Sequence, residues 1–300
     1  MRFKAVWSVL SLMAVVLLLI FYFMPTNKFN FSLEPGNSNF SITPNSEMQY
    51  YSNMRFADST ISYQISNCPL DKKNEMESAF EIIENLTSLK FNPVFDNGQI
   101  SVTCQEKARI ENEMFVAGEG GPVNITLSGN FYIITRGEIL LLRKSECPKP
   151  NIAIHELLHS LGFKHSENPK NIMYNITDCS QTIGDDTANL INNLYSIPSY
   201  SDLAFENISG IVNGRFLDVN ITVLNVGLGD AGVSKIIIYA DSSPIKEIDL
   251  DPIETGRGIF FSISHIFIPQ ISFTDLNLEI VSDFNEITKE NNKIKLKIKS

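Results

Sequence analysis

The chain has 300 residues, of which 43% are hydrophobic and 19% are charged, an ordinary composition for globular protein and enough length for two domains. Its formal net charge is −10 and its sequence pI is about 5.0. This acidic balance argues against nucleic acid as a partner, because phosphate binding needs a basic face.

Residues 1–24 have the pattern of a transmembrane signal-anchor. Arg2 and Lys4 precede an apolar run from Ala5 to Met24, which as a helix is long enough to cross about 30 Å of hydrocarbon. An uncleaved anchor is favoured over a signal peptide, because the end of the run offers no small residues for cleavage. Positive charge stays inside, so we expect a single-pass protein of the cell membrane with its domains on the extracytoplasmic side. Cleavage of the segment would make the protein secreted.

Residues 25–57 are rich in Asn, Ser, Pro and Phe and show no sustained hydrophobic period, which predicts a stalk or linker. From residue 58 to 198 the pattern changes to strands and helices. Asp71 is the expected N-cap of a helix, and its apolar stripe consists of Met76, Ala79, Phe80, Ile83 and Leu86. Further strands are expected at Ser59–Ser66, Gln99–Thr103, Val123–Ser128 and Phe131–Leu142. Two further helices are expected, one that begins at Asn151 and one from Gly184 to Tyr195.

The most informative stretch runs from His155 to His165 and contains three of the four histidines of the chain. On a helix, His155 and His159 leave the same face one turn apart, so both can bind one metal ion. Gly162 favours a helix end and a turn that brings in His165 as a third ligand. Three nitrogen ligands leave the fourth tetrahedral position of a zinc ion for water, and Glu156 is placed to act on that water as a general base.

The full pattern His-Glu-x-x-His-x-x-Gly-x-x-His resembles the metzincin clan of zinc endopeptidases, and Asn171-Ile172-Met173-Tyr174 resembles its methionine turn. Residues 58–198 resemble the matrixin branch most. The resemblance implies an α+β catalytic domain with a twisted mixed sheet and three helices, one catalytic Zn²⁺, and Met173 packed beneath the ion without binding it. It also implies a protein or peptide substrate bound along an edge strand. Calcium binding is compatible with the sequence, because Asp, Asn and backbone oxygens suffice for it.

The four cysteines, Cys68, Cys104, Cys147 and Cys179, all lie in this domain. In an oxidising compartment an even number predicts two disulfides with three possible pairings. We favour Cys68 with Cys104 and Cys147 with Cys179, a pair that would brace the zinc helix against the segment after the methionine turn. The less favoured alternative is a zinc-binding thiolate from Cys179, which would occupy the place of the water.

Residues 205–300 predict a second domain, a small all-β sandwich of immunoglobulin type, because period-two strands recur between turn signals. The strands are expected at Arg215–Leu224, Lys235–Asp241, Gly258–Ser264, Leu276–Ser282 and Lys293–Lys299. Residues 225–232 and 283–292 resemble the CARDB-like domains of surface proteins. The alternating lysines of the last strand predict a solvated sheet face, with an anionic surface as the lesser alternative. His265 is expected to be a strand residue and not a ligand.

Together these features predict a membrane-anchored, extracytoplasmic zinc endopeptidase that hydrolyses peptide bonds through a zinc-activated water and Glu156. One alternative is a catalytically idle surface adhesin that keeps the zinc site for stability and binds a cell-surface partner through the second domain. Glu156 argues against it, because a structural zinc site has no need of that carboxylate. A second alternative is a peptidase of cell-wall cross-links or of one dedicated protein.

Overall fold

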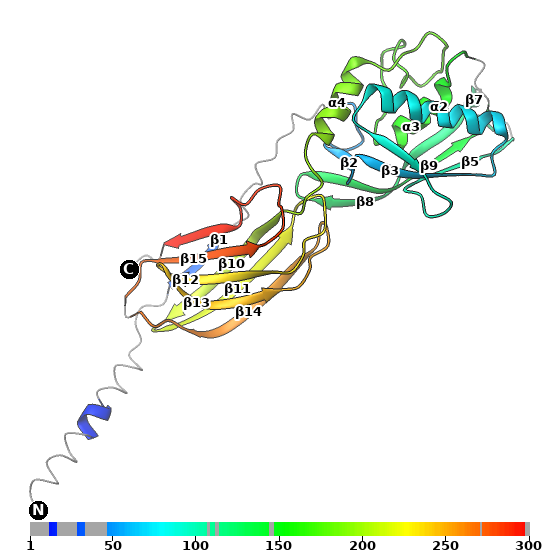
Figure 1. The fold of residues 1–300 in the computed structure, drawn as a ribbon. Coiled ribbons are helices and arrows are strands. Elements are labelled where there is room, and N and C mark those ends of the chain that lie inside the picture. The colour runs from blue at the N-terminus through cyan, green and yellow to red at the C-terminus, as the bar shows by residue number, and fades with distance from the viewer. Residues whose placement is uncertain are drawn as a thin grey trace, which may run out of the picture.

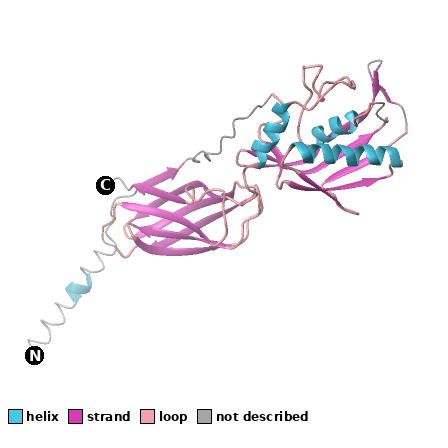
Figure 2. Ribbon diagram, turned by 45° about the horizontal axis from the view of Figure 1, so that its top comes forward, coloured by secondary structure: helices cyan, strands magenta, loops and turns pink. Residues whose placement is uncertain are grey.

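The computed structural model describes residues 12–16, 29–33, 47–106, 109–111, 114–143, 147–270 and 272–297. From residue 29 on they form a domain of mixed sheet and helices and an all-strand domain, which Figure 1 and Figure 2 show as separate bodies. Most of the expected transmembrane segment lies outside the described residues; Leu12–Val16 are helical and their side chains are exposed. Within the described ranges, no helix is both long enough and apolar enough to cross a membrane.

The first domain is built on a twisted mixed sheet, as the sequence predicted. Most pairs of adjacent strands in this sheet are parallel, and only the pair of β8 and β9 is antiparallel. In spatial order the strands are β2 (Met54–Phe56), β9 (Phe131–Leu141), β5 (Ile100–Cys104), β3 (Thr60–Ser66) and β4 (Lys90–Pro93), with β8 (Gly118–Ser128) paired to β9. A separate hairpin joins β6 (Arg109–Glu111) to β7 (Met114–Val116).

Three helices complete this domain, α2 (Leu70–Leu86), α3 (Asn151–Ser160) and α4 (Asp185–Tyr195). Their buried residues and those of the strands form one core. The predicted stripe of α2 is confirmed except for its last member, because Leu86 is 48% exposed. Asp71 is not the N-cap as expected. Pro69 precedes the helix, and Asp71 lies in the first turn, where its carboxylate accepts a hydrogen bond from the backbone of Lys72.

The second domain is a β-sandwich, as predicted, with two four-stranded sheets that enclose an apolar core. Buried residues alternate with more exposed ones along Phe216–Asn225, Ser234–Ala240 and Asp275–Ser282, which explains why the sequence predicted these strands. One sheet has the order β1 (Phe29–Leu33), β10 (Leu203–Asn213), β11 (Phe216–Asn225) and β14 (Gly258–Phe267). The other has the order β13 (Ser243–Leu250), β12 (Ser234–Ala240), β15 (Asp275–Ser282) and β16 (Lys293–Lys297).

The segment before the zinc domain is not a plain stalk. Its strand β1 pairs antiparallel with β10, with Phe29 opposite Val212 and Leu33 opposite Ile208. Further along, β2 joins the sheet of the first domain, and Gln49 forms a bridge with Phe163. The sequence missed these elements because each is only a few residues long and is stabilised by partners far away in the chain.

The two domains meet at the turn between β8 and β9. Phe131 and Ile133 of β9 pack with Leu228 of the sandwich, and the partly buried Ile287 joins them. The hydroxyl of Ser128 donates to the carbonyl of Gly227 at 2.6 Å. These apolar and polar contacts hold the sandwich against the zinc domain at this turn.

Two features of the sandwich match the sequence analysis. Lys293 lies 2.8 Å from a carboxylate oxygen of Glu279, and Lys295 lies 2.9 Å from one of Asp275. These lysines therefore belong to a solvated face with its own counter-ions, which weakens the alternative of binding an anionic surface. His265 is an exposed residue of β14 and belongs to the other domain from the three remaining histidines.

Candidate metal centre

Helix α3 carries the first two histidines of the motif, and every one of its residues is buried. It begins just after Pro150, whose fixed backbone angle suits the entry to a helix. The side-chain amide of Asn151 donates to the carbonyl of Asp178 at 2.8 Å. The start of the zinc helix is thereby tied to the chain beyond the methionine turn.

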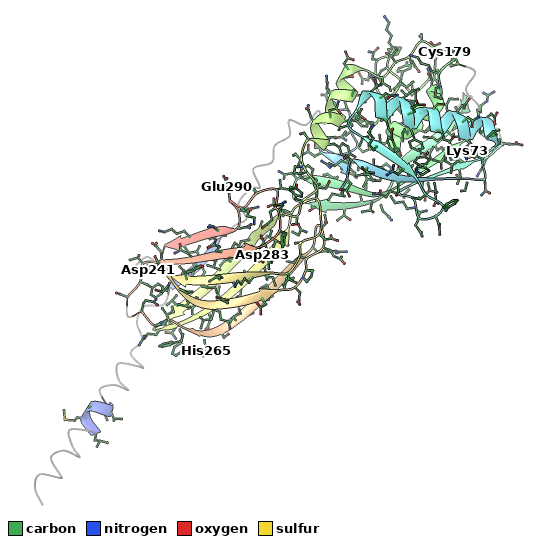
Figure 3. The ribbon with its side chains drawn as sticks, viewed as in Figure 1. Lys73, Cys179, Asp241, His265, Asp283 and Glu290 are labelled. Atoms are coloured by element: carbon green, nitrogen blue, oxygen red, sulfur yellow. A yellow bond between two sulfur atoms is a disulfide. The ribbon has the colours of Figure 1, made fainter. Side chains whose placement is uncertain are left out.

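The structure contains both disulfides that the sequence favoured, Cys68–Cys104 and Cys147–Cys179. The second one closes a loop of sequence separation 32 around the zinc motif. In the chain-entropy model such a cross-link stabilises the fold by about 3 to 4 kcal/mol. Because Cys179 is consumed in this bond, it is not a thiolate ligand. Figure 3 shows it at the end of the domain away from the sandwich.

The helix stops at Gly162, whose φ is +96°. The backbone N–H of Gly162 donates to the carbonyl of His159, and that of Phe163 donates to the carbonyl of Leu158. This pair of bonds is the Schellman arrangement, which requires a residue in the left-handed region. A Cβ at Gly162 would also come within 2.7 Å of the sulfur of Met54. Gly162 is therefore required both for the turn and for packing on β2.

The turn brings the three imidazoles together, as the sequence predicted. Nε2 of His159 lies 3.0 Å from Nε2 of His155 and 3.2 Å from Nε2 of His165. The ligand atoms of the three residues all lie within 4.8 Å of one another. His155 and His159 are buried, whereas His165 is exposed, so the cluster is open to solvent on one side.

The chemistry of these nitrogens fits a zinc ion. Nδ1 of His155 contacts the carbonyl oxygen of Ile172 at 2.7 Å, and Nδ1 of His159 contacts that of Phe163 at 2.7 Å. A carbonyl cannot donate, so each Nδ1 carries the hydrogen and each Nε2 has a lone pair. Two lone pairs that face each other at 3.0 Å do not attract, but a cation between them satisfies both. Zinc ligands at about 2.0–2.1 Å in tetrahedral geometry lie roughly 3.3 Å apart, close to the observed spacing.

Burial keeps the imidazoles neutral, as zinc ligands must be. It lowers the pKa of His155 and His165, and it lowers the pKa of His159 to about 4, with the neighbouring His155 as the next contribution. Both effects disfavour the charged imidazolium. The three residues are therefore ready to bind a metal at neutral pH.

The methionine turn positions two of the three histidines. Its residue Ile172 supplies the carbonyl that fixes the ring of His155, and the carbonyl of Met173 accepts from the backbone N–H of Ser166, next to His165. Met173 itself is 2% exposed and belongs to the core of the domain. The turn thus acts as a support for the metal ligands.

Glu156 is 6% exposed and lies against the first residues of β8. A Cβ on Gly118 would come within 2.7 Å of its side chain, and one on Gly120 would come within 2.2 Å of its backbone oxygen. Burial, with Glu119 as the next contribution, raises the pKa of Glu156 to about 8. A divalent cation nearby favours the charged form, which a general base needs. The sequence missed this packing, since the expected strand began only at Val123. The run of glycines was the available signal.

Tyr50 is a second residue that the sequence analysis missed. Its hydroxyl oxygen lies 3.0 Å from Nδ1 of His159, and its backbone N–H donates to the carbonyl of Gly162. Because the hydrogen on Nδ1 points to a carbonyl, the Tyr50 oxygen shares it as a second acceptor. The segment before the zinc domain thus contributes to the orientation of a metal ligand.

We expect Tyr50→Phe to weaken zinc binding about tenfold, at the low end of the effect of ligand-supporting groups, because the carbonyl of Phe163 still orients His159. A chelator competition that reports the zinc Kd measures this. Tyr51→Phe is the matched control, since Tyr51 stacks on Tyr132 with ring centroids 4.5 Å apart. Equal zinc affinities for both variants would show that Tyr50 has no such role.

The site consists of three clustered histidines, of which only His165 is exposed, on and after a helix that also carries the buried Glu156. Together with the mixed sheet and the methionine turn, this arrangement defines a zinc metallopeptidase of the metzincin type. Residues 55–196 match the family model described as Matrixin, so this part of the chain is a matrixin-like domain and the protein is a zinc metalloendopeptidase. None of the curated proteins compared with the chain matches it.

Proposed function

We propose that this protein is a membrane-anchored endopeptidase that acts on the extracytoplasmic side of the cell membrane. The observation that carries the peptidase part is the trio of clustered Nε2 atoms, two of which belong to the helix that also carries the buried Glu156. The anchor rests on the sequence of residues 1–24 and on the exposed apolar side chains of Leu12 and Met13. Cysteines used in disulfides support an oxidising, extracytoplasmic compartment.

In the mechanism that we propose, His155, His159 and His165 hold one Zn²⁺. When bound, zinc supplies Lewis acidity, which polarises the scissile carbonyl and makes a water molecule acidic near neutral pH. The carboxylate of Glu156 accepts the proton of the attacking water and later delivers it to the leaving amine. Glu156 is almost fully buried, so little other water reaches its carboxylate. Electrostatic interactions of the carboxylate with the metal and with the substrate are therefore stronger than they would be in water.

We further propose that the substrate binds in an extended conformation along β8. Among the described strands, β8 pairs only with β9, so its other edge has backbone groups available for an added strand. The first half of β8 passes directly over Glu156, because Gly118 and Gly120 leave no side chain in between. A peptide paired there would present its backbone to the metal centre, while the side chains of successive residues would point to opposite sides of it.

The adhesin alternative keeps the histidines but has no use for Glu156. A buried carboxylate whose pKa is raised to about 8 is an electrostatic cost that a structural site avoids. The same argument does not separate a general peptidase from one with a single dedicated substrate. A peptide-library cleavage profile separates these, since a dedicated enzyme cleaves few or none of the library sequences.

One experiment tests the anchor and the activity together. Membranes that carry the full chain should cleave a quenched peptide added from the outside, and the activity should stay with the membranes after carbonate extraction. Dialysis against a chelator should abolish cleavage, and stoichiometric zinc should restore it. Activity that resists the chelator would contradict the zinc mechanism, and activity released by carbonate would contradict the anchor.

A further inference from the structure

A cluster of carboxylates and amides lies where the linker between the domains enters the sandwich. It consists of Asp202, just before β10, and of Glu286, Asn291 and Asn292 from the loop between β15 and β16; we call it the junction cluster. Asp283 and Glu290 of the same loop are labelled in Figure 3. No residue of the cluster takes part in the zinc site.

Hydrogen bonds determine the orientation of the two side-chain amides in the cluster. The amide nitrogen of Asn291 donates to Oδ1 of Asp202 at 2.9 Å, and that of Asn292 donates to Oε1 of Glu286 at 2.9 Å. Carboxylate oxygens facing an amide can only accept, so the nitrogen of each amide must face its carboxylate. The oxygen of each amide is therefore left for another partner.

These oxygens have no partner within the described part of the chain. Oδ2 of Asp202 and Oδ1 of both Asn291 and Asn292 are buried without a hydrogen bond. Asp202 is 0% exposed and Asn292 is 1% exposed. Buried acceptors without partners are rare in native proteins, and three in one cluster indicate a ligand that accepts electron pairs. All three acceptors are oxygens, so the missing partner is a hard cation or a set of hydrogen-bond donors.

The charge of the cluster also favours a cation. The pKa of Asp202 is raised to about 6. Burial is the main cause and the charge of Glu286 adds to it, whereas hydrogen bonds from Asn291 and from the backbone of Thr288 oppose it. A nearby cation, Lys289, is exposed and donates to the carbonyl and hydroxyl of Ser282. Glu286 is only partly buried, and its oxygens accept hydrogen bonds from the backbone N–H of Leu203, the hydroxyl of Ser282 and the amide of Asn292. These donors are neutral, so the negative charge of the two neighbouring carboxylates is left for a cation to compensate.

We propose that the junction cluster binds one Ca²⁺ ion. Carboxylate and amide oxygens are the ligands that calcium takes in proteins, and calcium tolerates the irregular geometry of a loop. The absence of nitrogen and sulfur ligands from the cluster makes it unsuited to zinc. This site is independent of the peptidase activity, and its failure would leave the zinc mechanism untouched.

A calcium ion there would stiffen the junction between the domains. Ile287, next to Glu286, belongs to the apolar contact with Phe131 and Ile133 of the zinc domain, and its backbone N–H donates to the carbonyl of Ser201. An ion that joins Asp202 to this loop ties the linker to the surface on which the zinc domain rests. Calcium should therefore slow tryptic cleavage at the exposed Lys289.

The test uses the full chain loaded with zinc and carrying Glu156→Gln, which prevents self-cleavage. Calorimetric titration with CaCl₂ should give one calcium per chain and a higher thermal unfolding midpoint. Asp202→Asn should weaken binding at least tenfold, because calcium affinity follows the charge of its ligands. Asp283→Asn, an exposed carboxylate in the same loop, should bind within twofold of the parent.

Several results would overturn the proposal. They are the absence of calcium-dependent heat and of any shift in unfolding, an unchanged affinity in Asp202→Asn, or equal binding of MgCl₂. Should Asp202→Asn fail to fold, Asn291→Ala supplies the second test, since it keeps both carboxylates and removes one oxygen. Calcium binding to this variant at the affinity of the parent would count against the site.

Discussion

Replacing Glu156 with Gln is expected to lower kcat/KM for peptide cleavage by about a thousandfold, within the range for loss of a general acid–base group. The amide has the shape of the carboxylate but cannot accept the proton of the attacking water. Stability should not fall, because burial already disfavours the charged form, as the pKa of about 8 shows. Cleavage of a quenched peptide, together with the zinc content and the thermal unfolding midpoint, measures these effects.

Glu138→Gln is the matched control for this substitution. Glu138 is an exposed residue of β9 that lies 3.4 Å from Arg136, and its loss should leave activity unchanged. A surface ion pair of this kind contributes only about 0–1 kcal/mol. If Glu156→Gln bound zinc normally and kept the parental rate, the proposed mechanism would be wrong.

Among the substitutions of a β8 glycine by alanine, Gly120→Ala is expected to cause the largest loss of stability and of peptidase activity. The new Cβ would lie 2.2 Å from the backbone oxygen of Glu156, and a helix backbone cannot yield as a flexible side chain can. Such overpacking costs about 1 to 3 kcal/mol of stability. A displacement of about 1 Å at the metal centre typically costs on the order of a hundredfold in rate.

Gly121→Ala separates this packing effect from a general intolerance of β8 to side chains. Apart from its two chain neighbours, no residue has an atom within 4 Å of a Cβ at Gly121, although Gly121 directly follows Gly120. Denaturant unfolding and peptide cleavage should therefore be close to the parent for this variant. Equal losses in the two variants would mean that the strand, and not its contact with α3, is the sensitive feature.

The metal centre was largely predictable because its information is local. The geometry of one helix turn is enough to predict that His155 and His159 face the same ion, and Gly162 predicts where that helix ends. Met173 lies close enough in the chain for a single motif to include it. The pairing of the cysteines was one of three alternatives, and the structure contains the favoured one.

The parts that escaped prediction depend on partners far away in the chain. Tyr50 reaches His159 across a sequence separation of 109, so no local pattern connects them. The glycines of β8 show no apolar alternation, and their place in a strand follows from a close approach to α3. Phe29, Phe31 and Leu33 do alternate with polar residues, but five residues are too few to distinguish a strand from a linker.

The pairing of β1 with β10 affects how the protein can be divided for study. A fragment that begins with β10 would look like a complete sandwich by sequence, yet its outermost strand would present a bare row of amide and carbonyl groups. Such an edge recruits strands from other molecules, so the fragment should form aggregates or exchanged dimers. A usable fragment supplies residues 29–33 as well, either by circular permutation or as a separate peptide.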